Sequence, residues 1–221
     1  MDTSVRHFNQ LNTEEIPSQK KGYLIAKRIL DCTCALSASI LLSPLLLGIT
    51  VAIKIDSKGP VIFKHKRVGQ KGAPLYLYKF RSMYQNAEAM IKDFSPEQKA
   101  EWEKYFKLKH DPRITRVGKF LRKTSLDELP QLLNILQGNL SIVGPRPVTQ
   151  PEVDMYGENA EKFLSVKPGL TGYWQAYARS DVDYGTRQEM ELFYVDHANF
   201  WWDLKIIFAT FGAVLKCKGA R

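Results

Sequence analysis

Residues 35–53 read ALSASILLSPLLLGITVAI and decide the fold class, because these 19 consecutive residues carry no charge. A helix that crosses a membrane needs about 20 apolar residues, so the run is long enough to enter a bilayer. Asp31 and Asp56 close the run at its two ends. Proline removes a main-chain donor and clashes with the preceding helical turn. Ser43 and Pro44 are therefore the predicted break within the membrane.

Basic residues flank the apolar run on both sides. Lys27 and Arg28 lie before it and Lys58 lies after it. Since positively charged flanks stay on the cytoplasmic side, this pattern disfavours an external end. The sequence predicts a re-entrant helix over residues 21–58 that is broken at the proline and enters and leaves through one leaflet. A tilted transmembrane helix with a proline kink and a buried helix of a soluble protein are the alternatives.

The composition is that of a folded globular chain and excludes disordered and collagen-like classes, with 44% hydrophobic and 25% charged among 221 residues. The net charge of +9 is uneven, with +12 over residues 1–123 and −3 over residues 124–221. This asymmetry predicts that the first half meets an anionic surface, either a membrane leaflet or a nucleic acid. Three cysteines form no disulfide framework, so a reducing compartment is expected. Residues 1–20 are polar and are predicted to be a flexible tail.

The remaining sequence predicts a mainly helical α+β fold with a small β-hairpin. The hairpin is expected over residues 61–80, because alternating segments flank turn residues at 69–72. Another strand is expected at residues 173–177. Helices are expected over residues 86–108, with an interruption at the proline, and over residues 129–140, 151–164, 187–199 and 201–216. The last of these has aromatic and basic edges, which suit a helix in the membrane interface or a helix in a core.

A basic amphipathic segment precedes the middle of the chain. Arg113, Arg116, Lys119 and Arg122 recur at every third position with apolar residues between them. This pattern is typical of a solvated helix face or of contact with phosphate or lipid headgroups. Residues 59–221 are accordingly predicted to be a cytoplasmic catalytic domain with interfacial amphipathic helices.

The densest group of chemically active residues lies in residues 124–148, TSLDELPQLLNILQGNLSIVGPRPV. Adjacent carboxylates at Asp127 and Glu128 are expected to open a helix, where a cap formed by Ser125 or by Asp127 itself is the plain explanation. The cations nearby in sequence or motif are Lys79, Arg81, Arg122, Lys123 and Arg146. Paired carboxylates among cations suit a divalent metal bridging a phosphorylated substrate, with arginines holding phosphate oxygens. Aspartate also serves as a nucleophile at phosphorus.

Six ordered motifs together resemble the bacterial sugar transferases, the monotopic polyprenyl-phosphate phosphoglycosyl transferases. They are KRILD (27–31), the Ser43-Pro44 break, GPVIFKHKRVG (59–69), YKFRSM (78–83), the stretch of residues 111–148 from DPRITRVG to VGPRPV, and KPGLTGYWQ (167–175). The likeness covers residues 23–219, and it resembles the catalytic core of the family, with a C-terminal part closest to the hexose-1-phosphate transferases.

The resemblance implies an enzyme of the bacterial inner membrane, with its active site at the cytoplasmic face. Such an enzyme transfers a sugar-1-phosphate from a UDP-sugar to undecaprenyl phosphate, releases UMP and uses Mg²⁺ in exopolysaccharide, capsule, O-antigen or glycoconjugate synthesis. By resemblance, Asp127 is the nucleophile that forms a covalent aspartyl phosphosugar, and Glu128 is its partner. Both carboxylates are the expected metal ligands, although Glu128 could instead tune Asp127.

Further residues are expected to bind phosphate or other parts of the substrate. These are Lys79, Arg81, Arg122, Arg146, Gln175 and Arg179, of which Arg179 lies in the ARSDVDY tract expected to recognise the sugar. A catalytically inactive membrane scaffold for polysaccharide assembly is the alternative function. No nucleic acid partner is expected, since aromatic residues are not organised for base stacking. The sequence leaves open whether the chain forms a homo-oligomer.

Overall fold

The computed structural model describes residues 20–105, 108–178 and 182–215. The described residues divide into two compact units. The first unit holds the parts within residues 20–40, 64–77 and 131–215, and the second unit holds those within residues 41–63 and 78–130. Each unit is built around apolar side chains of its own.

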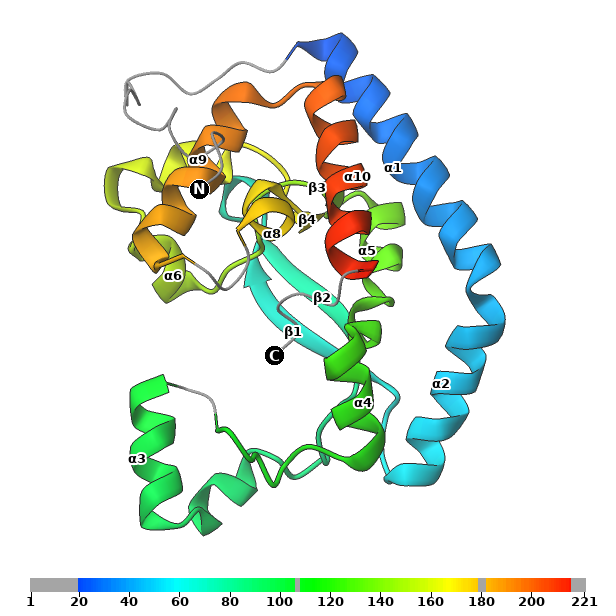
Figure 1. Cartoon of the computed structure of the whole chain (residues 1–221), viewed down its shortest axis with the longest axis vertical. Helices are drawn as coiled ribbons and strands as arrows, with labels where there is room; N and C mark the ends of the chain where they lie inside the picture. Colours follow the sequence, from blue (N-terminus) through cyan, green and yellow to red (C-terminus); the bar gives the residue numbers. More distant parts are fainter. Residues whose placement is uncertain (1–19, 106–107, 179–181, 216–221) are drawn as a thin grey trace. The chain divides into compact units, whose positions relative to one another are not determined.

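The elements follow one another along the chain as labelled in Figure 1. The α-helices are α1 (Lys21–Leu41), α2 (Ser43–Asp56), α3 (Pro96–Tyr105), α4 (Arg116–Thr124), α5 (Gln131–Gln137), α6 (Gln150–Asp154), α7 (Ala160–Leu164), α8 (Tyr173–Tyr177), α9 (Tyr184–His197) and α10 (Phe200–Leu215). The strands are β1 (Ile62–Val68), β2 (Pro74–Phe80), β3 (Ser141–Val143) and β4 (Gly169–Thr171). Short 3₁₀ turns are η2 (Gln70–Gly72), η3 (Ala89–Asp93), η4 (Leu126–Glu128) and η5 (Gly157–Asn159).

The prediction of a mainly helical α+β fold with a small hairpin is confirmed. Strands β1 and β2 form a two-stranded sheet, joined by turn η2. Within this turn Lys71 and Gly72 have positive φ angles of 55° and 76°. Glycine adopts that conformation at little steric cost, which is why the Gly69-to-Gly72 tract reverses the chain.

The strand predicted at residues 173–177 is wrong, since these residues form helix α8. The strand lies just before them, where β4 pairs in parallel with β3 through Ser141–Gly169 and Val143–Thr171. The close approach needs glycine, because a Cβ at Gly169 would lie 2.1 Å from the Gly144 nitrogen. Aromatic residues favour strands only weakly, and tertiary packing overrode that preference here.

Two of the predicted helices are interrupted in the structure. The segment expected to be helical over residues 86–108, with an interruption at the proline, forms the 3₁₀ turn η3 and then α3, which begins at Pro96. The segment expected over residues 151–164 forms α6, η5 and α7 in succession. Gly157 has a φ angle of 53°, which ends the regular helix between α6 and α7.

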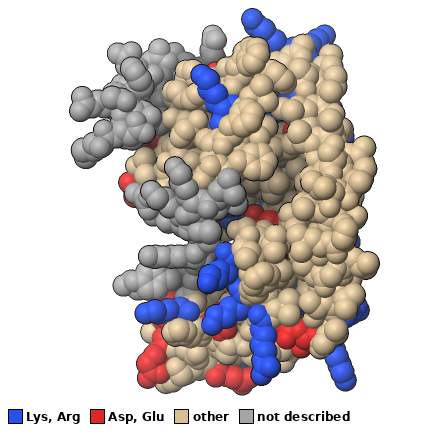
Figure 2. All heavy atoms as spheres, turned by 45° about the vertical axis from the view of Figure 1, so that its right-hand side comes forward, with Lys and Arg blue, Asp and Glu red and all other residues tan. Residues whose placement is uncertain are grey.

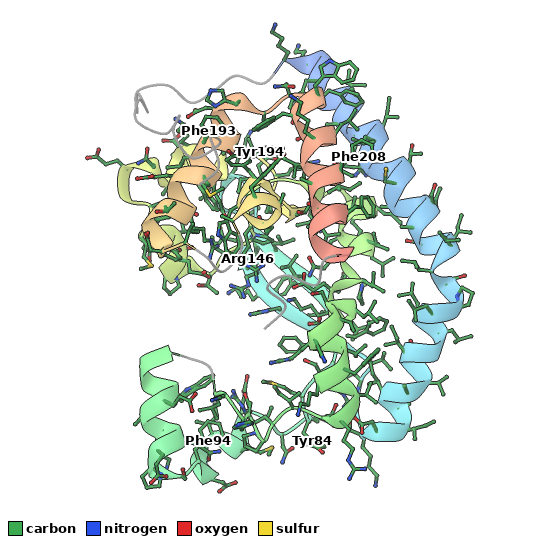
Figure 3. The ribbon with its side chains drawn as sticks, viewed as in Figure 1. Tyr84, Phe94, Arg146, Phe193, Tyr194 and Phe208 are labelled. Carbon is green, nitrogen blue, oxygen red and sulfur yellow. The ribbon has the colours of Figure 1, made fainter. Side chains whose placement is uncertain are left out.

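The core of the first unit lies where α8, α9 and α10 meet strands β3 and β4 (Figure 1). Tyr173 from α8 contacts Phe193 and Trp202 from the two long helices, with ring centroids 5.5 Å apart in each pair. Tyr194, labelled with Phe193 in Figure 3, donates a hydrogen bond of 2.7 Å to the buried Asp203. Helices α9 and α10 are thus joined by apolar contacts and by a buried polar link.

Helix α1 is docked on the first unit by a row of polar side chains. The Tyr23 hydroxyl and the Lys27 ammonium both donate to the Asp203 carboxylate, at 2.9 and 2.7 Å. Arg28 donates to the carbonyls of Ile135 and Leu136 and so satisfies the end of α5. The same row includes Asp31, which accepts from the Ser141 hydroxyl and the Ile142 amide.

The other side of α1 is apolar and uncovered. Ile25 and Ile29 are each 62% exposed and Ile40 is 66% exposed. Figure 2 shows the surface along α1 as almost free of charged side chains, with basic atoms where the helix begins. An exposed continuous apolar face of this kind marks an interaction surface.

The helix is interrupted at Leu42, between α1 and α2, as Ser43 and Pro44 predicted. Pro44 lies in the first turn of α2, where its missing N–H costs no helical hydrogen bond. No single helix in the described parts is long and apolar enough to cross a membrane, whereas α1 and α2 meet those criteria together as a pair bent by 62°.

The core of the second unit joins α2, α4 and the end of β2. Ile53, Phe80 and Leu121 are all at most 4% exposed. Helix α4 approaches the segment after β2 closely, because a Cβ at Gly118 would lie 2.0 Å from the Ser82 carbonyl oxygen. Glycine at position 118 therefore sets the distance between α4 and the segment that follows Lys79 and Arg81.

Candidate functional site

The paired carboxylates lie in a short 3₁₀ turn and do not open a helix. Helix α4 ends at Ser125, whose φ angle of 57° is in the left-handed region, and η4 then holds Asp127 and Glu128. The Ser125 side chain makes no capping hydrogen bond, so the explanation of the pair by a cap at Ser125 is wrong. Asp127 is not a cap either, because it lies inside η4, and α5 begins only at Gln131.

Apolar neighbours hold this turn in place. Leu126 and Leu129 pack against the core of the second unit on either side of the carboxylates. The chain changes direction at Ser125, where α4 ends, so the two carboxylates extend from a backbone that is held in place. Such support allows charged side chains to be held in a defined geometry.

A lysine from strand β2 meets the pair directly. The Lys79 ammonium lies 2.6 Å from Glu128 Oε1, and the two side chains are 20% and 29% exposed. Burial raises the pKa of Asp127, and the neighbouring Glu128 charge also acts in that direction, while Lys79 and Arg122 act to lower it. The net effect is a carboxylate that is more basic than an ordinary aspartate.

Arg122 is the second cation at this position. Its Nε donates to the Ser82 hydroxyl at 2.8 Å, which fixes the guanidinium at the end of α4. Among the described residues no hydrogen-bond acceptor is found for its two terminal nitrogens. Ser82 was missed from the sequence, although it stands in the same YKFRSM motif as Lys79 and Arg81.

Arg81 has a different environment from the one its predicted phosphate contact requires. The side chain is only 6% exposed. Its terminal nitrogens donate to the carbonyls of Ser57 and Lys58 and to the Ser57 hydroxyl. These bonds hold the loop that follows α2, and a Cβ at Gly59 would collide with the guanidinium. The geometry therefore favours a structural role for Arg81, and its phosphate contact stays a prediction.

Arg113 is neither a solvated residue nor a lipid contact. It forms two hydrogen bonds with the Asp111 carboxylate, at 2.8 and 2.7 Å, and it is 5% exposed. Its guanidinium lies 4.3 Å from the Trp102 ring and 5.2 Å from the Phe94 ring, the latter labelled in Figure 3. Arg113 therefore anchors the segment between α3 and α4, which the three-residue spacing did not reveal.

The remaining predicted residues belong to the first unit or lie outside the described residues. Arg146 follows strand β3 between two prolines (Figure 3), and its guanidinium lies 6.0 Å from the Trp174 ring. No carboxylate partner for its side chain is found in the described residues. Gln175 lies in α8 and is half-buried. Arg179 lies outside the described residues.

The carboxylates suit a magnesium ion that is bound together with a phosphorylated substrate. Within the described ranges no three His, Cys, Asp or Glu side chains gather as a metal site. Mg²⁺ commonly takes one or two carboxylates and completes its shell with water and substrate phosphate oxygens. Asp127 and Glu128 provide that donor set, so the residues present fit this ion.

Comparison with known proteins supports one family over nearly the whole chain. The model described as bacterial sugar transferase matches residues 22–217. The undecaprenyl-phosphate galactose phosphotransferase of Salmonella typhimurium is 45% identical over 204 residues, which cover 91% of this chain and 43% of that protein. The UDP-glucose:undecaprenyl-phosphate glucose-1-phosphate transferase of Escherichia coli is 39% identical, over 84% of this chain and 39% of that protein.

A shorter relative matches along most of its own length. The exopolysaccharide production protein ExoY of Rhizobium meliloti is 42% identical over 89% of this chain and 88% of that protein. The chain thus spans less than half of the Salmonella and Escherichia proteins and most of the Rhizobium one. Since a single family model covers the hairpin, the carboxylate turn and the helices around them, the chain belongs to the bacterial sugar transferase family.

Proposed function

We propose that the protein transfers a sugar-1-phosphate from a UDP-sugar to undecaprenyl phosphate, with release of UMP. The family membership and the names of the relatives support the substrate classes. The observation that carries the proposal is the environment of Asp127: a half-buried carboxylate of raised pKa beside Glu128, with Lys79 and Arg122 next to it.

In the first step an Asp127 carboxylate oxygen attacks the β-phosphorus of the UDP-sugar. The bond from that phosphorus to the bridging oxygen breaks, and UMP leaves with this oxygen. The product on the protein is an acyl phosphosugar on Asp127. Lys79 and Arg122 support this step, because their charges offset the charge that develops on the phosphate oxygens.

In the second step a phosphate oxygen of undecaprenyl phosphate attacks the same phosphorus. The phosphorus–Asp127 bond breaks, the carboxylate is regenerated and undecaprenyl diphosphate sugar forms. Two displacements at one nucleophile allow a small site to treat a soluble and a lipid substrate in turn. When bound to Asp127 and Glu128, Mg²⁺ would supply Lewis-acid stabilisation of phosphate charge.

The same proposal places the chain on the cytoplasmic leaflet of the bacterial inner membrane. The exposed apolar side of α1 and the exposed Leu47, Val51 and Ile55 of α2 supply surface for lipid. The polar side chains of α1, which include Lys27, instead form hydrogen bonds with other residues of the protein. A bent pair entering one leaflet accounts for both observations and leaves the basic flanks in the cytoplasm.

Trapping the intermediate tests the covalent mechanism. Purified protein is incubated with UDP-galactose labelled at the β-phosphorus and then quenched, and the adduct is located by peptide mass spectrometry. The expected result is a label on Asp127 in the absence of acceptor that is lost when undecaprenyl phosphate is added. Product formation at the normal rate by Asp127→Asn would refute the mechanism. Absence of turnover with every UDP-sugar would favour the inactive scaffold instead.

A further inference from the structure

The second unit contains a pocket that the proposed chemistry does not use. Its volume is about 500 Å³, which is within the range of pockets that hold small molecules. One wall comes from the segment that follows α2, and the other comes from the segment that follows β2. The lining residues are Ser57, Lys58, Tyr84, Gln85 and Asn86.

The side chains that line the pocket are polar, and none of them is acidic. Lys58 provides an ammonium group, Tyr84 (Figure 3) provides a hydroxyl group, and Gln85 and Asn86 provide amide groups. Lys58, Tyr84 and Asn86 are exposed, and among the described residues no hydrogen bond or ion pair is found for the ends of these side chains. The pocket therefore offers hydrogen-bond donors together with a positive charge, a combination that suits an anion.

A buried cation supports the wall formed by Ser57 and Lys58. Arg81 Nη2 donates to the Ser57 carbonyl at 2.7 Å and to the Ser57 hydroxyl at 2.9 Å, and Nη1 donates to the Lys58 carbonyl. Within the described residues no carboxylate pairs with Arg81, so no acid neutralises its charge there. Because the Ser57 hydroxyl accepts from Arg81, its own hydrogen can be donated to a ligand.

Gly59 brings the two walls of the pocket together. Its φ angle of 122° is one that residues with a side chain rarely adopt. A Cβ at this position would lie 2.8 Å from Gln85 Oε1 and would collide with the Arg81 guanidinium. The Lys54 ammonium donates to the Gly59 carbonyl at 3.1 Å and adds a second cation at the end of α2. Specific contacts therefore hold the loop after α2 against the segment that carries Gln85.

The pocket begins where the exposed apolar side of α2 ends. Ile55 is 81% exposed and stands two residues before Ser57, and Val51, one turn earlier, is 50% exposed. In the proposed arrangement α2 leaves the cytoplasmic leaflet at this point, which places Lys58 at the depth of the lipid headgroups. Anionic lipids of that leaflet attract basic residues next to a membrane segment. The occupant favoured by both charge and position is therefore a lipid phosphate.

We propose that this pocket binds the phosphate group of an anionic phospholipid. Lys58 forms the charged contact with a phosphate oxygen, and Ser57 and Tyr84 donate hydrogen bonds to it. This inference rests on the proposed function, because that function places α2 in the cytoplasmic leaflet. The bound lipid fixes the depth at which α2 leaves the membrane.

Lipid binding to the purified full-length chain tests the assignment. Phosphatidylglycerol is titrated into the protein in dodecyl maltoside, and native mass spectrometry measures the fraction of protein that carries a lipid. Lys58→Met is expected to weaken phosphatidylglycerol binding about tenfold, as for the loss of a hydrogen bond to a charged group. Lys92→Met is the matched control, since Lys92 is exposed in η3 of the same unit and does not line the pocket. Equal binding by wild type and Lys58→Met would overturn the proposal.

Two further measurements test the preference for negative charge. Asn86→Asp retains the side-chain shape and adds a negative charge, so it should weaken phosphatidylglycerol binding about tenfold. Phosphatidylcholine has the phosphate group but no net charge, and wild type should bind it about tenfold more weakly than phosphatidylglycerol. Equal affinity for the two lipids, or unchanged binding in Asn86→Asp, would contradict an anionic ligand.

Competition distinguishes the possible sources of the phosphate. Inorganic phosphate in tenfold excess should leave phosphatidylglycerol bound, because it lacks the acyl chains that concentrate a lipid in the micelle. Undecaprenyl phosphate in equal amount should remove no more than about half of the bound phosphatidylglycerol, as for a competitor of no higher affinity. Complete displacement by either compound would overturn the assignment to a phospholipid.

UMP release from UDP-galactose, measured on the same preparations, separates this inference from the proposed function. If wild type binds phosphatidylglycerol through Lys58 but releases no UMP, the catalytic proposal fails and the lipid site stands. If wild type releases UMP and Lys58→Met binds phosphatidylglycerol as wild type does, the lipid site fails and the catalytic proposal stands.

Discussion

Lys79 Nζ lies 2.6 Å from Glu128 Oε1, which places a cation from strand β2 directly against the acid that follows Asp127. The ion pair joins two segments 49 positions apart in the sequence. Because Lys79 also lowers the pKa of Asp127, one lysine affects both carboxylates of the proposed site.

Removing the Lys79 charge should shift the pH dependence of transfer. Asp127 must be ionised to attack, so activity rises with pH through its pKa. In Lys79→Met that pKa rises further, since a positive neighbour is lost, and the acid limb of kcat/KM should move to higher pH. UMP release measured across pH checks this, with the exposed Lys71→Met of the hairpin turn as control. An unmoved limb would contradict the role of Lys79.

The ionised side chain of the proposed nucleophile, Asp127, should lower the stability of the folded protein. A carboxyl group whose pKa is raised on folding binds its proton more tightly in the folded state, so its ionised form destabilises the fold above that pKa. Asp127→Asn should therefore raise Tm by about 2 to 4 °C at pH 7 and by less near pH 4. Thermal unfolding of wild type and variant at both pH values measures this, while transfer by the variant is lost. A lower Tm at pH 7 would refute the expected sign.

Some features of the fold and of the candidate site could be predicted from the sequence, because they depend on local sequence patterns. Turn residues at 69–72 predicted the hairpin, the uncharged run predicted the pair α1 and α2, and Pro44 predicted the break between them. The motifs that resemble the family also identified Asp127 and Lys79 as candidate site residues. The structure places both in the second unit, together with Glu128.

The remaining features depend on tertiary contacts that no local pattern encodes. Asp127 was expected at a helix start, but the left-handed Ser125 places it in a 3₁₀ turn. Arg81 is expected from the sequence to contact phosphate, and Arg113 to be solvated or to contact phosphate or lipid headgroups, whereas both side chains are buried against specific partners within the protein. A basic residue at regular spacing looks the same in sequence whether it meets solvent, a carbonyl or an aromatic ring.

Gly118 is expected to control Arg122 through the packing of α4. A methyl group at this position would lie 2.0 Å from the Ser82 carbonyl oxygen, so Gly118→Ala must push α4 away from Ser82. The Arg122–Ser82 hydrogen bond would then lengthen, and kcat/KM for the donor should fall about tenfold or more. Kinetics of Gly118→Ala and of Gly212→Ala, where a Cβ meets nothing within 4 Å, provide the comparison. Similar kinetics in Gly118→Ala and wild type would exclude this packing role.

The Asp111–Arg113 pair should stabilise the second unit at neutral pH. Burial acts to raise the pKa of Asp111, but Arg113 reverses this and the net shift is downward. Its contribution is therefore present above the unfolded pKa of about 4 and is lost as pH falls through the lower folded value. Asp111→Asn should cost about 1 to 3 kcal/mol at pH 7 and less in acid. Denaturant unfolding at two pH values tests this, and an equal cost at both would argue against the ionic contribution.

The membrane topology of the bent pair α1 and α2 can be tested in cells. If α1 and α2 enter and leave through the cytoplasmic leaflet, residues on either side of the pair stay inside the cell. Gln10→Cys and Lys58→Cys, each introduced after the three native cysteines are replaced by serine, should react with an impermeant maleimide only after the cells are opened.

Replacing Ser43 and Pro44 by leucine removes the break, and a continuous apolar helix of this length is able to cross a bilayer. That variant should expose position 10 in intact cells while position 58 stays protected. Labelling of Gln10→Cys in intact cells with the native Ser43 and Pro44 would show that the pair crosses the membrane.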